Sequence, residues 1–173
     1  MNFLEQLAAE WYEYNGYFVR TNIKFGRNAG GRGGHAGEID VIGFKPETHV
    51  FVHIEASTDA RGPLERKKRF ERQFTNAREY YMEIFPFKEI GIKPKQIAIV
   101  GFNLNINPAY ENWKSLPPTG SLWGDLRIEV IHIPIFIKQI AVELKNRDPQ
   151  NEAIPETLPL LRAIQYTVFY NKI

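Results

Sequence analysis

Cysteine is absent from the 173 residues of the sequence. Disulfide bonds, zinc sites built on thiolates and thiol nucleophiles are therefore excluded, and nothing in the composition points to an oxidising compartment. Long uncharged stretches are also missing, because no run of about 18 residues, the length that a membrane-spanning helix needs, is free of charged side chains. The chain begins MNFLEQLAAEWYEYNGY, which is acidic where a signal peptide has a basic start and an apolar run. We therefore expect a cytoplasmic protein.

Net charge is also small, since 22 lysines and arginines face 20 aspartates and glutamates and the formal net charge is +2. A pI near 8.8 does not by itself indicate a nucleic-acid-binding protein. The charge is unevenly distributed, however, because seven basic and two acidic residues lie between positions 61 and 78. Such a segment attracts a polyanion. Its basic residues are Arg61, Arg66, Lys67, Lys68, Arg69, Arg72 and Arg78.

Local patterning predicts a helix, a strand and a hairpin in the first third of the chain. Apolar side chains recur at helical spacing over residues 2–15 and stop at Asn15-Gly16, a good helix exit. Residues 17–25 alternate as in a half-buried strand. The glycine-rich segment GRNAGGRGGHAG follows. The apolar runs EIDVIGF (38–44) and VFVHIEAS (50–57) are then separated by a short turn, which favours an antiparallel hairpin.

The next part of the chain predicts a helix and two strands. Pro63 suits the first turn of a helix, and a helical stripe continues from there until Pro86. Residues 96–102 and 126–133 are apolar strands. The segment between them looks like a long surface excursion, and we expect its aromatic residues to tether it to the core. These residues are Tyr110, Trp113 and Trp123.

Two further helices complete the chain, over residues 134–144 and from Leu158 to about Val168. The order of elements is therefore helix, three strands, helix, two strands and two helices. This order predicts an α/β protein with a mixed central sheet flanked by helices. A chain of this length, with 43% hydrophobic residues, is expected to form a single domain over residues 1–173.

Acidic residues interrupt both strands of the predicted hairpin. Because side chains alternate between the faces of a strand, Glu38 and Asp40 share one face of the first strand. The face of the second strand that carries Glu55 also carries His53, which we interpret as a hydrogen-bonded histidine, and Ser57. Two carboxylates inside apolar strands repel each other unless a cation or a proton lies between them. Mg²⁺ fits such a place, because it accepts carboxylate oxygens and keeps water molecules for a substrate phosphate.

The predicted hairpin resembles that of the PD-(D/E)xK nuclease superfamily. It consists of GEIDVIGF, a short turn and VFVHIEAS, and it lies between a helix that carries a glutamate and a second, long helix. This superfamily includes many restriction enzymes and archaeal Holliday-junction resolvases, and its pattern is an acidic residue, a hairpin and then E-x-K. The resemblance spans about residues 2–102 and implies a restriction-endonuclease-like αβββαβ core. Residues 103–173 would then be a C-terminal elaboration with an extra strand and helices. The resemblance also implies an endonuclease that hydrolyses DNA phosphodiesters with Mg²⁺, or Mn²⁺ in its place, in restriction, repair or junction resolution.

By this resemblance, Asp40 and Glu55 are the metal-binding carboxylates, and the Ala56 carbonyl also contacts metal. Glu5 resembles the first-helix glutamate of resolvase-like members, which would bind a second metal or a metal-bound water. Glu10 is its rival, because the two glutamates lie on opposite flanks of the apolar stripe and only one of them points at the hairpin. We prefer Glu5.

The sequence departs from the superfamily at Ser57, which stands where the motif lysine is expected. That lysine is usually assigned to positioning the attacking water and stabilising charge on the pentavalent phosphate, tasks that a neutral hydroxyl performs only in part. We assign Ser57 to orienting the water and expect another cation to replace the lysine. Candidates by proximity in sequence are Lys24, Arg61, Lys67 and Lys68.

DNA, duplex or branched, is the expected partner, and two basic regions are expected to contact it. One is the glycine-rich loop beside the hairpin, which lacks the G-K-[ST] ending of a phosphate-binding P-loop. The other is the basic helix and the residues that precede it. The contacting residues would be Arg27, Arg32, Arg61, Arg66, Lys67, Lys68 and Arg69.

Two other functions stay open on the sequence alone. A nuclease-like module could bind nucleic acid without cutting it, which the missing lysine favours. A protein-interaction domain could use the aromatic excursion and the terminal helices instead. The apolar last helix suits either a homodimer interface or packing within the chain.

Overall fold

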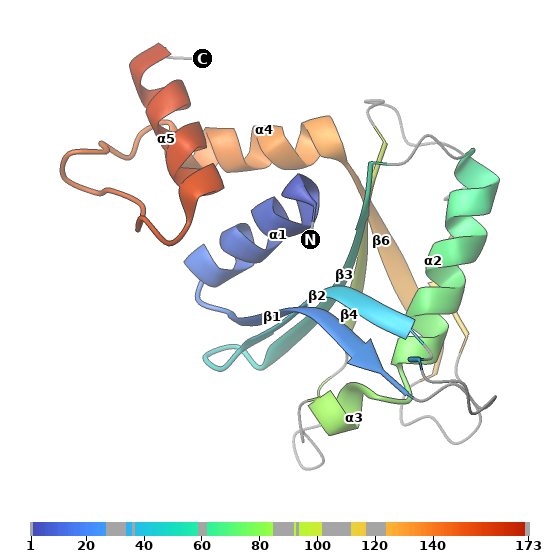
Figure 1. The fold of residues 1–173 in the computed structure, drawn as a ribbon. Helices are drawn as coiled ribbons and strands as arrows, with labels where there is room; N and C mark the ends of the chain where they lie inside the picture. The colour runs from blue at the N-terminus through green and yellow to red at the C-terminus, as the bar shows by residue number, and fades with distance from the viewer. Residues whose placement is uncertain are drawn as a thin grey trace.

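The computed structural model describes residues 2–26, 34–35, 37–58, 62–84, 92, 94–101, 112–116 and 124–171. These segments form a six-stranded mixed sheet with helices on its two faces, so the α/β class expected from the sequence is confirmed (Figure 1). The elements are α1 (Phe3–Tyr14), β1 (Phe18–Phe25), β2 (Gly37–Lys45), β3 (Val50–Ser57), α2 (Pro63–Ala77), α3 (Tyr81–Ile84), β4 (Lys95–Val100), β5 (Lys114–Ser115), β6 (Leu126–His132), α4 (Ile133–Leu144) and α5 (Pro159–Asn171).

The strands lie in the order β1-β2-β3-β4-β6-β5. β1, β2 and β3 form an antiparallel meander, β3, β4 and β6 run parallel, and β5 pairs antiparallel with β6. Parallel neighbours need a crossover connection, which α2 and α3 provide between β3 and β4. The carboxyl ends of the three parallel strands therefore meet at one edge, where Ser57 pairs with Val100 and Val100 with His132.

Both faces of the sheet are covered, because the central strands carry apolar side chains on both sides. α1, α4 and α5 lie on one face, called here the α1 face, and α2 lies on the other, the α2 face (Figure 1). The core of the α1 face joins Leu4 and Phe136 to Ile54. On the α2 face, Phe70 is in a cluster with Trp113.

α5 packs within the chain, which is one of the two alternatives that the sequence left open for the apolar last helix. Leu161 and Val168 belong to the core of the α1 face, and α5 contacts both α4 and α1. Within the described segments, no helix is long and apolar enough to cross a membrane.

Two parts of the chain differ from the expectation or refine it. The helix predicted from Pro63 to Pro86 is wrong as a single element, because a turn at residues 78–80 separates α2 from α3. The excursion contains the short strand β5, and Trp113 beside it is 1% exposed and stacks on Phe70 with ring centroids 6.3 Å apart. The tether prediction is thus confirmed for Trp113. Tyr110 and Trp123 lie outside the described residues.

Candidate active site

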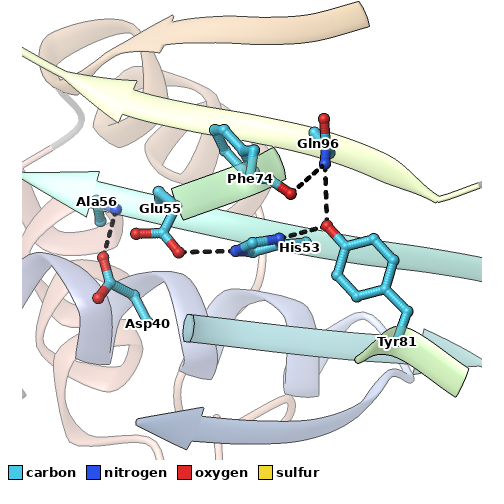
Figure 2. A network of polar contacts seen from close by, with 7 residues as sticks. All are labelled: Asp40, His53, Glu55, Ala56, Phe74, Tyr81 and Gln96. Carbon is cyan, nitrogen blue, oxygen red and sulfur yellow. Dashed lines mark hydrogen bonds and ion pairs between the residues drawn. The ribbon is translucent and has the colours of Figure 1, made fainter. Parts of the chain in front are cut away.

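The hairpin of β2 and β3 opens at Asp40. Its ladder of paired residues ends with Val41 and Ile54. Beyond this pair, Asp40 Oδ2 accepts a hydrogen bond of 2.8 Å from the backbone N–H of Ala56. On the other side of β2, the ladder pairs Thr21 with Val41 and Ile23 with Ile39, so Asn22 and Asp40 are not paired with each other. Asn22 has a φ of 52°, in the left-handed region that asparagine tolerates. As a result, the Asp40 carboxyl group faces β3 beside Glu55 (Figure 2).

Glu55 is fully buried on the α2 face of β3. Its Oε1 accepts a hydrogen bond from His53 Nε2 at 2.7 Å. Burial raises the pKa of Glu55 well above its usual range, although the charge of Arg69 and, to a lesser extent, hydrogen bonding with Asp40 act against this. Burial first, and the Glu55 charge second, raise the pKa of Asp40 to about 8. The two carboxyl groups therefore retain at least one proton at neutral pH unless a cation replaces it.

A divalent cation fits this pair in charge and in donor type. Nitrogen donors bind one oxygen of each group, Asp40 Oδ2 and Glu55 Oε1, and the other oxygens are of the kind that Mg²⁺ prefers. Over the described ranges, no three His, Asp or Glu side chains are grouped as a ready metal shell. Mg²⁺ does not require one, because it commonly binds through one or two carboxylates and keeps several waters.

An open cleft with a volume of about 260 Å³ lies where α1, the end of β3 and α2 meet. Glu55 does not belong to its lining and has no exposed surface, but it directly precedes Ala56, which does line the cleft. The sequence-predicted residues Glu5, Asp40, Ala56 and Ser57 all line this one cleft. The full lining is Asn2, Glu5, Asp40, Ala56, Ser57, Thr58, Arg69 and Gln73.

Glu5, and not Glu10, faces the hairpin. Glu5 lines the cleft, and its charge contributes to the raised pKa of Asp40. It also closes a capping box, since its Oε2 accepts a hydrogen bond from the Asn2 N–H at 2.9 Å. Glu10 is directed to α5, where its Oε2 accepts hydrogen bonds from the N–H groups of Leu160 at 2.8 Å and Leu161 at 2.9 Å.

Arg69 brings a positive charge to the cleft from α2. Its guanidinium group lies over the Phe70 ring, 4.8 Å from the centroid, and its charge favours the ionised form of Glu55. The sequence placed Arg69 only among the contacts to nucleic acid, because helical spacing alone does not show which member of a basic run turns toward the sheet.

The other predicted basic residues lie elsewhere. Arg66 is buried near Gly101, and its charge contributes to the lowered pKa of His132, which burial chiefly causes. Lys67 is half-buried and Lys68 is exposed on α2, and neither belongs to the lining of the cleft. Lys24 is exposed on β1, where it pairs with Glu38 across the ladder. The remaining predicted contacts, Arg27, Arg32 and Arg61, lie outside the described residues.

Two residues that sequence reasoning missed reach Glu55 through His53. His53 Nδ1 is 2.5 Å from the Tyr81 hydroxyl, which is 3.0 Å from Gln96 Nε2 (Figure 2). The interpretation of His53 as a hydrogen-bonded histidine is confirmed, and burial lowers its pKa to about 3, so the ring is neutral. Gln96 had a signal, because it is the polar residue in the apolar run QIAIV. Tyr81 had none, because it belongs to a helical stripe that predicts core packing alone.

A larger groove of about 580 Å³ lies at the opposite ends of the parallel strands, where β4 and β6 begin. Its lining consists of Pro94, Lys95, Gln96, Leu126, Arg127 and Glu129. Buried carboxyl groups with raised pKa values in a cleft are typical of functional sites. The smaller cleft, beside Asp40 and Glu55, is therefore the candidate functional site.

No protein-family model, curated protein or solved structure matches the chain.

Proposed function

We propose that the chain is a divalent-metal-dependent endonuclease that hydrolyses phosphodiester bonds in DNA, and that its core is restriction-endonuclease-like. The order from α1 to β4 supports this, since it is αβββαβ apart from the one-turn helix α3. An antiparallel hairpin that carries Asp40 and Glu55 and is followed by a parallel strand also supports a PD-(D/E)xK nuclease. β6, α4 and α5 would be additions to that core.

The observation that carries the proposal is the buried pair of Asp40 and Glu55. Two adjacent buried carboxyl groups are costly for stability, and apolar residues of similar volume would fill the same space without that cost. Such a pair is instead expected where a cation must be bound.

Asp40 and Glu55 would hold Mg²⁺ or Mn²⁺, with the Ala56 carbonyl next to them in the chain. Such an ion supplies an activated water molecule and neutralises charge on the phosphoryl oxygens. Ser57, in the lining of the cleft, would accept a hydrogen bond from the attacking water and orient it. Glu5 would bind a second ion or a water molecule at the rim.

Arg69 would provide the positive charge that Ser57 does not. It lines the cleft together with Asp40 and Ser57. Arginine stays protonated at all relevant pH values, so it stabilises negative charge on the phosphoryl group without transferring a proton. We therefore assign the replacement of the motif lysine to Arg69, in preference to Lys24, Lys67 or Lys68.

The exposed side of α2 would contact the DNA backbone. Lys68 and Arg72 are exposed on this helix, whose Arg69 reaches the cleft. Phosphate contacts of this kind fix the position of a duplex without reading its sequence. Their contribution to binding should weaken as salt increases.

A second candidate is a module that binds nucleic acid without cutting it. Ser57 in place of the lysine favours this function, and so does the capping box, which engages Glu5 with Asn2. This candidate requires salt-sensitive binding and no product with any divalent metal.

Cleavage assays distinguish the two candidates. Supercoiled plasmid, single-stranded DNA, a four-way junction and an RNA hairpin would each be incubated with the protein in Mg²⁺, Mn²⁺ or EDTA. We expect metal-dependent cutting of DNA that is lost in Asp40→Asn and in Glu55→Gln. Cutting by either variant at the wild-type rate would overturn the proposed endonuclease. Binding of DNA by the wild-type protein without any product would favour the second candidate.

A further inference from the structure

A continuous chain of five polar side chains is buried behind Glu55 on the α2 face. None of the five is more than 2% exposed. Buried polar groups are costly unless each donor meets an acceptor, so the direction of every hydrogen bond in such a chain is constrained. In order toward Glu55, the five residues are Arg78, Ser115, Gln96, Tyr81 and His53.

The Phe74 carbonyl orients the Gln96 amide. A carbonyl only accepts hydrogen bonds, so the Gln96 atom 3.4 Å away from it is the nitrogen Nε2. The same nitrogen donates to the Tyr81 hydroxyl oxygen at 3.0 Å. Gln96 Oε1 accepts from the Ser115 hydroxyl at 2.5 Å. Arg78, which only donates, bonds the Ser115 carbonyl at 3.0 Å and its hydroxyl at 3.4 Å.

This orientation favours one tautomer of His53. Because Gln96 donates to the Tyr81 oxygen, Tyr81 is left to donate its own hydroxyl proton to His53 Nδ1 at 2.5 Å. The ring proton is then on Nε2, which donates to Glu55 Oε1 at 2.7 Å. The opposite tautomer would make the Tyr81 oxygen accept from both Gln96 and His53, and it would require Glu55 to carry a proton on Oε1. With this tautomer, each side chain from Arg78 to His53 donates to the next one toward Glu55; Figure 2 shows the part of the chain from Gln96 to Glu55.

We propose that Tyr81 and Gln96 are positioning residues that, through His53, hold Glu55 with Oε2 toward Asp40 and thereby set the affinity of this pair for a divalent cation. The inference rests on the proposed function, since it assigns these residues to the same metal site. A glutamate side chain has several rotatable bonds, and fixing it in one rotamer costs conformational entropy. His53 anchors Oε1 from the same face of β3, and Tyr81 holds the imidazole from α3.

Tyr81→Phe tests the chain with little change in packing. The variant keeps the ring that lies against Phe51 and His53, with centroids 5.1 and 5.5 Å away, and removes only the hydroxyl. Partners that orient a ligating group commonly change metal affinity by about 10- to 100-fold. We expect a loss of that size in Mn²⁺ affinity, measured by electron paramagnetic resonance of free Mn²⁺, and recovery of DNA cleavage at saturating metal.

Tyr12→Phe is the matched control, because Tyr12 packs against the core of the α1 face, away from the chain of hydrogen bonds. Its Mn²⁺ affinity should equal that of the wild-type protein. Ser115→Ala, at the outer part of the chain, should give a smaller loss than Tyr81→Phe and provides a second variant if the thermal unfolding of Tyr81→Phe shows a disrupted fold. Equal Mn²⁺ affinity in wild-type protein, Tyr81→Phe and Ser115→Ala would overturn the inference and leave the proposed function intact.

The tautomer of His53 gives a measurement that needs no metal. Long-range ¹H–¹⁵N correlation spectra of the metal-free protein, assigned with His53→Gln, should show the proton on Nε2. A proton on Nδ1 would overturn the inference whatever the metal affinities are. Failure of the wild-type protein to bind Mn²⁺ at all would overturn both the inference and the proposed metal site.

Discussion

The two faces of the sheet bury polar side chains in different ways. On the α1 face, Glu10 and Gln165 bond mainly backbone groups. Glu10 accepts the N–H groups at the start of α5 and one side-chain donor, Gln6 Nε2, at 2.9 Å. Gln165 accepts the Ile154 N–H at 3.0 Å and donates to backbone carbonyls. On the α2 face, the polar side chains bond mainly to one another, and their chain of hydrogen bonds ends at Glu55.

This difference distinguishes buried polar side chains that support the fold from buried polar side chains that orient a group of the candidate site. A buried side chain that bonds backbone groups satisfies donors or acceptors that the fold would otherwise leave unpaired. The hydrogen-bonded chain on the α2 face does not have this role. It ends at the carboxyl group of Glu55, whose raised pKa shows that burying its charged form is itself costly. We therefore expect substitutions of the buried polar residues on the α1 face to change stability, and substitutions of those on the α2 face to change chemistry.

The largest effect is expected at the paired carboxyl groups. Asp40→Asn and Glu55→Gln keep the side-chain volume and remove the charge that would hold the metal. Several kcal/mol of transition-state stabilisation depend on such an ion, so cleavage rates should fall about a thousandfold, or about 4 kcal/mol. Single-turnover cleavage in Mg²⁺ measures the rate, and circular dichroism should show an unchanged fold. A rate within tenfold of wild type would contradict the comparison of the two faces.

The next effect is expected at Arg69. Removing a group that stabilises developing negative charge commonly costs about a hundredfold or more in rate, which we expect for Arg69→Ala. Arg72→Ala is the matched control, because Arg72 is an exposed arginine on the same helix and does not line the cleft. The control should weaken DNA binding at low salt and leave the rate on bound DNA unchanged. Equal rates for the two variants would show that the positive charge of the site comes from another residue.

An effect on stability alone is expected on the α1 face. Glu10→Ala removes the acceptor of the Leu160 and Leu161 N–H groups. Leaving buried donors unpaired costs about 1–3 kcal/mol in the free energy of unfolding, which urea denaturation measures. Glu13→Ala, an exposed change on the same helix, should have little effect. A loss of Mn²⁺ affinity in Glu10→Ala at unchanged stability would contradict the separation of the two faces.

The smallest effect is expected in the pH dependence of stability without metal. The pKa of Asp40 is raised from 3.8 to about 8 in the folded protein, so the folded state holds a proton that the unfolded state releases. The free energy of unfolding should therefore fall between pH 6.5 and 8, by about 1–2 kcal/mol from this group. His53 does not change the free energy of unfolding in this window. Its pKa is lowered from 6.5 to about 3 in the folded protein, so the stability that its neutral ring contributes is lost only as pH falls below 6.5.

Urea denaturation at a series of pH values measures this dependence. Asp40→Asn should make the decrease above pH 6.5 shallower, because the variant lacks the Asp40 proton and keeps only that of Glu55, whose pKa is also raised. Excess Mg²⁺ should also reverse the decrease in the wild-type protein, since metal binding favours the ionised carboxylates. A slope that is identical in the wild-type protein and in Asp40→Asn would assign the pH dependence to other groups.

Much of the fold could be predicted from local pattern. The apolar runs at residues 38–44 and 50–57, separated by a short turn, predicted β2 and β3, and helical spacing predicted α1, α4 and α5 within a few residues of their bounds. The break between α2 and α3 could not be predicted in this way, because the helical stripe continues across it. Arg78 at this turn donates to the Ser115 carbonyl and, at 2.6 Å, to the Gly124 carbonyl, both far away in the sequence.

The sequence by itself determined the residue types of the candidate site, because a carboxylate in each strand of an apolar hairpin already requires a proton, a cation or a counter-charge. It did not determine which other groups surround them. The opening of the hairpin at Asp40, the choice of Glu5 over Glu10, the approach of Arg69 and the chain from Gln96 through Tyr81 to His53 all depend on how α1, α2 and α3 pack on the sheet. Only the tertiary structure decided these contacts, because they join residues from separate elements whose spacing along the chain carries no information about their distance in space.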